Sequence, residues 1–454
     1  MNMLSVFSRE LGLHHIRDSH CPRDVAFIIL SRFVRLLGFG AVAPILLIFL
    51  RALDIPERTV GFFLSATLLG DVALSLLVTQ TADLLGRRRM LALGSLLMAA
   101  SGIAFYRSTS FAVLLIAAVV GIISPSGNET GPFAALEQAM LSQLTEPDGR
   151  VSLLMWYQVV GFAGMGVGNV ITGVLVSTMT NQGTPALDAY RVVFLVYAGA
   201  AALKVALSCA LSAQSELHAP SLPTDPVSSA AETQDDERRP LLHEQHSPTT
   251  AALLDPPEEQ PPPPARLSMA RLVTLCLIFS LDSFASSLGP GSFIAYFLRE
   301  AFAAPVSLIA SVLSVTSVTA CVSQLAAGSI AKRLGVVVTM VATHLPAQAF
   351  TIAFGLAPTL PLALTFLIAR SCITSMDSAV RGAFLAAVVP KESRTRFLGI
   401  VNVCKTLAST PGPSLALGLA SLGGIRLVFV CMGSIKVVYD IVLLLLFKTA
   451  PLEH

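Results

Sequence analysis

Apolar residues gather in long runs along most of the chain, and polar residues are largely confined to the segments between those runs. A helix of about 20 apolar residues is long enough to cross a lipid bilayer. By this rule the first half predicts membrane helices near residues 25–50, 59–82, 89–107, 111–143, 151–178 and 190–212. The second half predicts helices near residues 270–298, 304–331, 335–357, 360–388, 396–420 and 425–448.

The central segment differs from both halves because it is polar and rich in proline, with a run at Pro261–Pro264. Such segments do not bury enough apolar surface to fold. We expect an all-α membrane protein with twelve transmembrane helices, arranged as two pseudo-symmetric six-helix bundles. The expected parts are a tail at 1–24, a bundle at 25–212, a disordered linker at 213–265, a bundle at 266–448 and a tail at 449–454.

The composition supports a membrane protein. Of the 454 residues, 54% are hydrophobic and 13% are charged, and the mean hydropathy is +0.73. A soluble protein of this length would carry about a quarter charged residues. The first 23 residues are too polar for a cleavable signal peptide. The seven cysteines form no CxxC pair, so we expect single buried thiols and no metal site.

The basic residues indicate the orientation. If the N-terminus is inside, the outer loops hold only Arg51, Arg58, Arg107, Arg191, Arg299 and Arg426. Many more basic residues fall on the opposite loops, the bias that cytoplasmic loops carry. We therefore expect both termini and the linker in the cytoplasm. The linker segment Glu237–Leu242 resembles an acidic dileucine sorting signal, so we expect either the plasma membrane or the vacuolar membrane.

A basic turn occurs twice, at the end of the second span of each half. The first copy contains Asp83, Gly86, Arg87 and Arg88, and the second contains Arg333 and Gly335. Glycine permits a sharp turn between two helices. A turn that is repeated about half a chain later is typical of an internally duplicated transporter.

The first turn resembles the loop signature of the major facilitator superfamily, G-x-x-x-D-[R/K]-x-G-[R/K]-[R/K]. Thr79 stands in place of its first glycine and Leu84 in place of its first basic residue, and the second copy has Lys332 in place of the acid. The segments Ser126–Phe133 and Asp377–Gly382 are similar to a little-studied fungal branch. The resemblance implies a secondary active transporter that works by alternating access.

The same resemblance implies that the basic turn is a cytoplasmic gate motif, formed by the six residues of the two copies named above. In this family the turn latches the two halves together on the cytoplasmic side. A carboxylate at a helix end can accept hydrogen bonds from guanidinium groups or a helix N-terminus. The plainer alternative is that the arginines only anchor the topology.

Ionisable residues inside the predicted spans give the candidate site. They are Arg32, Arg35, Lys204, Arg370, Arg381, Lys405 and Lys436, with Asp71, Glu129, Asp282, Asp377 and Asp440. Each would cost about 2.5–3.5 kcal/mol or more at the centre of a lipid-facing helix. Most must therefore pair or face water, which predicts a polar pathway between the bundles. The basic excess favours an anionic substrate, with Arg32, Arg35, Arg370 and Arg381 as candidate contacts.

The acidic residues are candidates for ion coupling. We expect Glu129 or Asp282 to carry a coupling proton, with Asp71 and Asp377 as further candidates, and permanently paired carboxylates are an equal alternative. Two pairs are spaced four residues apart on one helix, Asp377 with Arg381 and Lys436 with Asp440, and each pair predicts an ion pair.

Helix breaks are expected where glycine and proline interrupt a span. Glu129 lies in such a stretch, Pro125–Pro132, and similar breaks are expected at Gly289–Gly291 and Pro411–Pro413. Interrupted helices expose backbone groups that must line protein or water, where transporters commonly bind ions or substrate. His344 is the only histidine within a span and is expected to pack in the core, whereas Tyr157 is expected to be an interfacial anchor.

The expected partners are a small organic solute, a coupling proton and the lipid bilayer, with no nucleic acid, no cofactor and no metal, and the chain is expected to work as a monomer. No HExxH, Gly-x-Ser-x-Gly or P-loop motif occurs, so the sequence predicts no enzyme. One alternative is a drug or metabolite efflux antiporter, although the glycine-rich fifth span lacks the Gly-Pro pair of the exporters in the family. Another alternative is a non-transporting membrane sensor.

Overall fold

The computed structural model describes residues 19, 21–121, 123, 132–216, 269–334, 336–376, 381 and 394–447. Contacts group residues 1–217 and 267–454 into one compact unit. The other unit, residues 218–266, lies outside the described residues and takes in most of the expected linker. The elements of the described part are helical, which confirms the expected all-α fold class.

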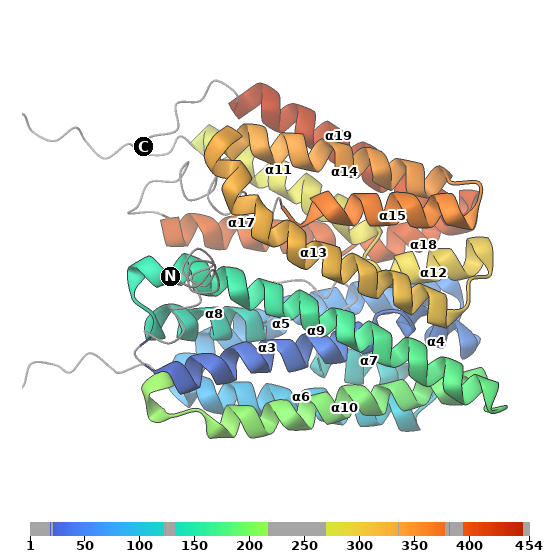
Figure 1. Cartoon of the computed structure of the whole chain (residues 1–454), viewed down its shortest axis with the longest axis horizontal. Coiled ribbons are helices and arrows are strands. Elements are labelled where there is room, and N and C mark those ends of the chain that lie inside the picture. The colour runs from blue at the N-terminus through green and yellow to red at the C-terminus, as the bar shows by residue number, and fades with distance from the viewer. Residues whose placement is uncertain are drawn as a thin grey trace, which may run out of the picture. The chain divides into compact units, whose positions relative to one another are not determined.

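The N-terminal half comprises α3 (Pro22–Val42), α4 (Leu46–Ala52), α5 (Glu57–Leu85), α6 (Arg87–Arg107), α7 (Phe111–Val120), α8 (Pro132–Leu144), α9 (Pro147–Asn181), α10 (Ala186–Ala210) and the 3-10 turn η1 (Ala213–Ser215). The C-terminal half comprises α11 (Met269–Leu288), α12 (Gly291–Phe302), α13 (Val306–Leu334), α14 (Val336–Leu356), α15 (Leu360–Thr374), α17 (Arg394–Ser409), α18 (Gly412–Gly423) and α19 (Arg426–Phe447). Every predicted span overlaps at least one of these helices (Figure 1).

Eight helical segments of the described part are long and apolar enough to cross a membrane, and α7 and α15 are shorter apolar helices. Two predicted breaks are present, between α11 and α12 and between α17 and α18. The first span is also broken between Val42 and Leu46, which the sequence analysis did not predict. Pro44 lies in this gap and has no backbone N–H to continue the helix. The expected break around Glu129 lies outside the described residues.

Gly86 is the only residue between α5 and α6, and its φ of 90° allows the sharp turn that the sequence predicted. We call this end of the helices the basic end, because Arg87–Arg89 lie there. The start of α3 lies at the same end, since Asp24 accepts hydrogen bonds from the backbone N and the Oγ of Ser212, just after α10. The opposite end, which holds α4 and α12, is called the far end (Figure 1).

Glycines allow α3 and α9 to pack with their backbones in contact. A Cβ added at Gly168 would lie 2.1 Å from the carbonyl oxygen of Leu37, and one added at Gly164 would lie 2.3 Å from that of Phe33. Thr172 Oγ1, one turn further along α9, donates to the carbonyl oxygen of Ala41 at 2.6 Å. The glycine-rich fifth span therefore brings α9 against α3, as small residues do at close helix contacts.

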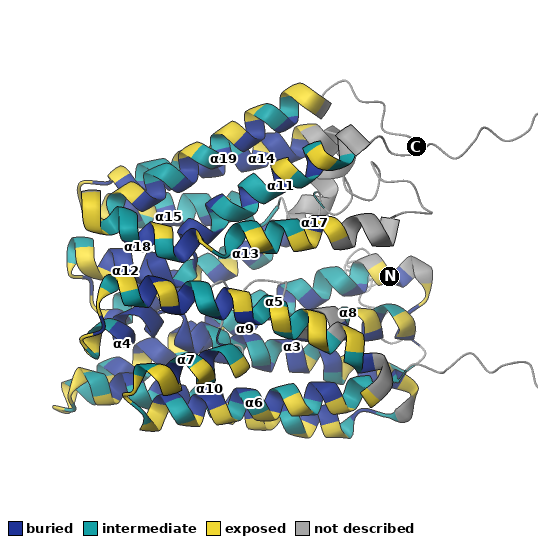
Figure 2. Cartoon of the chain, turned by 180° about the vertical axis from the view of Figure 1, so that it is seen from behind, coloured by how far each residue is buried: buried dark blue, intermediate teal, exposed yellow. Residues whose placement is uncertain are grey.

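Among the described residues, the apolar core is shared between the halves at the far end. There, one cluster joins residues of both halves, among them Phe49, Phe63, Phe293 and Phe297. Towards the basic end, one buried cluster lies within the N-terminal half and another within the C-terminal half. Leu277 is among the large apolar side chains that remain exposed. Figure 2 shows that exposed positions recur along many of the helices.

Candidate functional site

A buried carboxylate organises the polar residues of the N-terminal half. Glu137 on α8 is fully buried and forms ion pairs with Arg35 on α3, at 3.1 Å, and with Lys204 on α10. Tyr157 on α9 donates its hydroxyl hydrogen to the same carboxylate at 2.6 Å. Lys204 Nζ also donates to Ser31 Oγ at 2.9 Å. Four helices therefore converge on one acidic group, which we call the Glu137 cluster.

Arg32 extends this cluster. Its guanidinium carbon lies 4.5 Å from the centre of the Tyr157 ring, and its Nη2 donates to Gln158 Oε1 at 2.8 Å. Arg32 and Arg35 thus share one face of α3, as their spacing predicted. The prediction that Tyr157 is an interfacial anchor is wrong, because its side chain is fully buried and its hydroxyl is hydrogen-bonded to Glu137.

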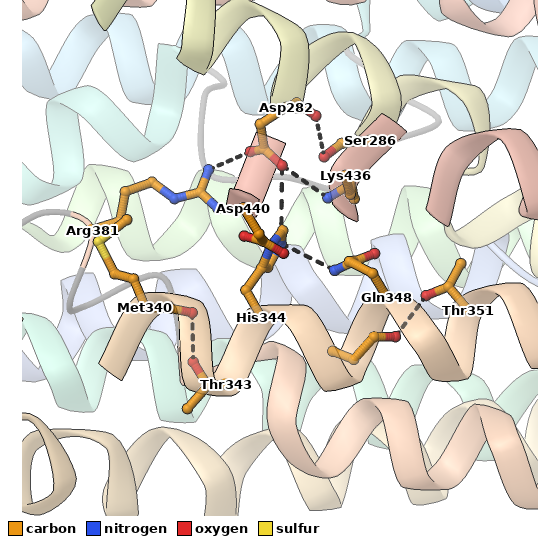
Figure 3. A network of polar contacts seen from close by, with 11 residues as sticks. Asp282, Ser286, Met340, Thr343, His344, Gln348, Thr351, Arg381, Lys436 and Asp440 are labelled. Atoms are coloured by element: carbon orange, nitrogen blue, oxygen red, sulfur yellow. Dashed lines mark hydrogen bonds and ion pairs between the residues drawn. The ribbon is translucent and has the colours of Figure 1, made fainter. Parts of the chain in front are cut away.

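A second cluster forms around Asp282 in the C-terminal half (Figure 3). Arg381 Nη1 lies 2.5 Å from Asp282 Oδ2, and Lys436 Nζ on α19 lies 3.1 Å from Asp282 Oδ1. His344 Nε2 on α14 lies 3.9 Å from the same Oδ1. Only 2% of Asp282 is exposed. Two cationic side chains therefore compensate the charge of this carboxylate, which we call the Asp282 cluster.

His344 links the Asp282 cluster to Asp440 on α19. Its Nδ1 lies 2.8 Å from Asp440 Oδ1 and 2.9 Å from Asp440 Oδ2, and its Nε2 lies 3.1 Å from the amide nitrogen of Gln348. Pro346 lies inside α14 close to these groups and removes one helical N–H from the backbone. His344 is buried in the core, as expected, and it also lies within a polar network that the sequence did not predict.

The residues of the two expected i, i+4 pairs make contacts between helices. Arg381 pairs with Asp282, and Asp377 lies outside the described residues, so the Asp377–Arg381 pair stays a prediction. Lys436 reaches Asp282 and Asp440 reaches His344, so these two residues belong to a network of three helices and are not an isolated pair. The reason is geometric, because α19 packs against both α11 and α14 and places these groups within contact distance.

The remaining candidates differ in what the structure shows. Arg370 on α15 has a buried Nε with no hydrogen-bond partner. Asp71 is half-buried on α5. Glu129 lies outside the described residues, as do Gly335 and the side chains of Asp83 and Arg333.

The basic turn is held by a residue that the sequence assigned to the linker. Glu216 accepts hydrogen bonds from the backbone N–H groups of Arg87, at 2.7 Å, and Arg88, at 3.1 Å, at the N-terminus of α6. Arg87 Nη1 donates to Gln143 Oε1, and Arg88 Nη2 donates to the carbonyl oxygen of Cys209. A cavity of about 660 Å³ lies at this turn, between α5, α6 and the end of α10.

Hydrogen bonds between the halves lie towards the far end and the middle of the spans. Ser65 on α5 and Ser414 on α18 are 2.7 Å apart through their hydroxyl oxygens. Tyr296 on α12 donates to Glu57 at 2.9 Å, and Ser314 on α13 donates to the carbonyl oxygen of Gly166 at 3.0 Å. Together with the shared apolar core, these contacts close the far end.

Sequence reasoning missed Glu137, although it lies within the predicted span 111–143 and a complete count of ionisable residues would have found it. It also missed Gln348 and Glu216. Gln348 follows His344 by one helical turn, so the i, i+4 spacing was a usable signal. Glu216 gave no signal, because its partners are backbone groups more than 100 residues earlier.

Comparison with known proteins identifies the relatives of this chain. A model of the Major Facilitator Superfamily matches residues 28–288 and 275–454. The uncharacterized membrane protein YJR124C of Saccharomyces cerevisiae is 31% identical over 428 residues, which cover 94% of each chain. This yeast relative agrees with the expected fungal branch.

Solved structures share the fold at low sequence identity. The human organic anion transporter MFSD10 (TETRAN) is 19% identical with a TM-score of 0.58, covering 93% of this chain and 99% of its own. A D-xylose-proton symporter is 16% identical with a TM-score of 0.68, covering 94% and 98%. The nucleoside transporter NupG is 14% identical with a TM-score of 0.63, covering 94% and 99%. At these identities the likeness extends to the fold alone.

Proposed function

The chain belongs to the major facilitator superfamily, and from that premise we propose that it is a secondary active transporter that carries a small organic anion by alternating access. The basic end faces the cytoplasm in this proposal, with both termini inside, and the membrane is the plasma membrane or the vacuolar membrane. The far end is closed by the shared apolar core. The described conformation is then the inward-facing one.

The Glu137 cluster is the observation that supports an anionic substrate. It gathers Arg32, Arg35 and Lys204 around one carboxylate, within helices long enough to span a bilayer. In the described part of the chain, three cationic side chains thus gather at one buried carboxylate. A bound anion would be attracted to such a group of cations inside a membrane span.

Arginine suits this task because its planar guanidinium matches the two oxygens of a carboxylate or phosphate. Arg370 and Arg381 are the corresponding candidates in the C-terminal half. Arg370 has a buried Nε without a partner, which a substrate oxygen would satisfy. The human organic anion transporter with the same fold agrees with such a substrate class. The coupling ion in this proposal is a proton, with Asp282, Glu129, Asp71 and Asp377 as candidate carriers.

Uptake into proteoliposomes tests the proposal. The purified full-length chain is reconstituted, and uptake of radiolabelled succinate and citrate is compared with that of two neutral solutes, xylose and uridine. We expect a carboxylate to be carried faster than either neutral solute. Loss of one charge-assisted contact costs about 1.5–3 kcal/mol, so Arg32→Gln or Arg35→Gln should lower uptake at low substrate concentration by about 10- to 150-fold.

The control is Arg191→Gln, which removes an arginine from a solvent-exposed pair with Asp188 and should leave uptake unchanged. Lysine replacements at Arg32 and Arg35 keep the charge and separate electrostatic loss from misfolding. Uptake at the wild-type rate by a variant lacking Arg32, Arg35, Arg370 and Arg381 would refute the anion site. Faster uptake of a neutral solute by the wild type would do the same.

A further inference from the structure

The surroundings of His344 contain buried acceptors that lack a donor. The amide oxygen of Gln348 is buried and accepts no hydrogen bond. Asp282 Oδ1 is ion-paired with Lys436 but also accepts no hydrogen bond. Both groups lie next to His344 Nε2. The amide nitrogen of Gln348 is 3.1 Å from this atom, and Asp282 Oδ1 is 3.9 Å from it. Buried acceptors without a donor are uncommon in folded proteins and call for an explanation.

The hydrogen bonds of His344, with the Gln348 amide in its described orientation, match one neutral tautomer. Asp440 has only acceptor oxygens, so His344 Nδ1 must donate to it. The amide nitrogen of Gln348 has only hydrogens to give, so His344 Nε2 must accept from it through its lone pair. His344 Nε2 is therefore the nitrogen that carries no proton in this arrangement.

We infer that His344 Nε2 is the binding site of the coupling proton. In this inference Gln348 accepts a hydrogen bond from the protonated nitrogen, and Asp282 faces its positive charge. This inference rests on the proposed function as a proton-coupled transporter. A proton from the aqueous solution binds Nε2 as the Gln348 amide turns, so the hydrogen bond from the amide nitrogen to Nε2 breaks and no covalent bond of the protein does. The amide oxygen of Gln348 then accepts from Nε2–H, while Asp282 Oδ1 faces a second positive charge besides Lys436.

The charges around His344 link the proton to the substrate. Within the described part of the chain, the charged groups that face it are Asp282, Asp440, Arg381 and Lys436, two of each sign. Protonation of the imidazole adds one positive charge to this group. An anion binding nearby would then be favoured, and by reciprocity the bound anion favours the proton. Proton and organic anion would therefore travel together.

Imidazole suits this role better than the Asp282 carboxylate. Asp282 is contacted by two cations, and their positive charge opposes the addition of a proton. Histidine is the side chain that ordinarily changes charge between about pH 5 and pH 8. Arg381 keeps 18% of its side-chain surface exposed, compared with 3% for His344 and Asp282, so it is the most exposed of these three side chains.

The first test reads the proton directly and needs no substrate. The other seven histidines lie outside the predicted spans, so a variant that replaces them with glutamine leaves His344 as the only imidazole. Nitrogen-15 spectra of this protein in lipid nanodiscs report the protonation of each ring nitrogen. We expect Nδ1–H with bare Nε2 at alkaline pH, and protonation of Nε2 as the pH is lowered. An imidazole that stays neutral throughout this titration would overturn the inference.

The second test separates coupling from transport. For one proton per anion, a gradient of one pH unit supports about tenfold accumulation of the solute. We expect His344→Gln to abolish this accumulation of labelled succinate or citrate, while exchange of the same solute between the two sides of the vesicle continues. The control is His243→Gln in the linker. Accumulation by His344→Gln at the wild-type level would overturn the inference.

Gln348→Met is a second variant that keeps the volume of the side chain but removes the amide oxygen. We expect a smaller protonated fraction of His344 in the same nitrogen-15 spectra at low pH. An unchanged fraction would exclude Gln348 as the acceptor of this hydrogen bond. If His344 takes up the proton at Nε2 but neither carboxylate is carried by the wild type, the proton site stands and the proposed substrate class fails.

Discussion

Replacing Glu137 with glutamine tests whether the Glu137 cluster stabilises the N-terminal half. The substitution keeps the size of the side chain but removes its charge. Arg35 and Lys204 would then be left without their carboxylate, and Lys204 is fully buried. Breaking a buried ion pair by removing one partner typically costs about 3–5 kcal/mol of the free energy of unfolding. We expect Glu137→Gln to lose an amount of this size.

The loss can be followed by thermal unfolding in detergent. Trp156 is the only tryptophan of the chain and lies next to Tyr157, so its fluorescence reports on α9 beside the cluster. For a folding unit of 150–250 residues each kcal/mol shifts Tm by about 2–4 °C, so the expected decrease is about 6–20 °C. All variants are compared at one scan rate, because unfolding of such proteins is often irreversible.

The matched control is Asp188→Asn, which breaks the pair with Arg191. The Asp188 side chain is 51% exposed, so this pair contributes only about 0–1 kcal/mol. In a Glu137→Gln background, Lys204→Met removes one of the two uncompensated cations and should restore part of the lost Tm. A Tm for Glu137→Gln within about 2 °C of the wild type would contradict the stabilising role, since that corresponds to about 1 kcal/mol or less.

Two further predictions concern the basic turn and the contact between α3 and α9. Glu216→Ala removes a cap that stabilises α6 by about 0.5–2 kcal/mol. Hydrogen exchange of the backbone amides of Arg87 and Arg88 should therefore become about 2- to 30-fold faster. Unchanged exchange would show that the cap is dispensable. Gly168→Ala forces a Cβ against the α3 backbone and should lower the free energy of unfolding by about 1–3 kcal/mol, whereas Gly199→Ala, which meets open space, should not lower it.

The apolar spans followed from the sequence because membrane insertion requires long hydrophobic segments, and this requirement acts on each segment separately. Two of the helix breaks followed for a similar reason, since glycine and proline act locally on the backbone. The break near Pro44 was open to the same reasoning, because this proline removes a backbone N–H, but it was not predicted. The apolar run continues through Pro44, so the hydropathy pattern alone gave no boundary there.

The ion pairs did not follow from the sequence, because they depend on which helices pack together. Lys436 and Asp440 share one helix face, yet Lys436 contacts α11 and Asp440 contacts α14. Spacing along a helix identifies residues that are able to meet, but it does not rank them against partners on other helices. The same limit hid His344, whose partners come from α11 and α19 as well as from its own helix.

The arrangement of the two clusters has a consequence for alternating access. Each of the buried ion pairs described above lies within one half, and the hydrogen bonds that join the halves at the far end are made by neutral hydroxyl groups and one glutamate. Separating buried charges from each other costs several kcal/mol, whereas parting apolar surfaces and hydroxyl contacts costs far less per contact. If the far end opens by a rocking motion, both clusters can stay intact while the apolar contacts around Phe49 and Phe293 separate. Proton and substrate would then act on the equilibrium by changing the charge inside a half, and not by breaking charged contacts between halves.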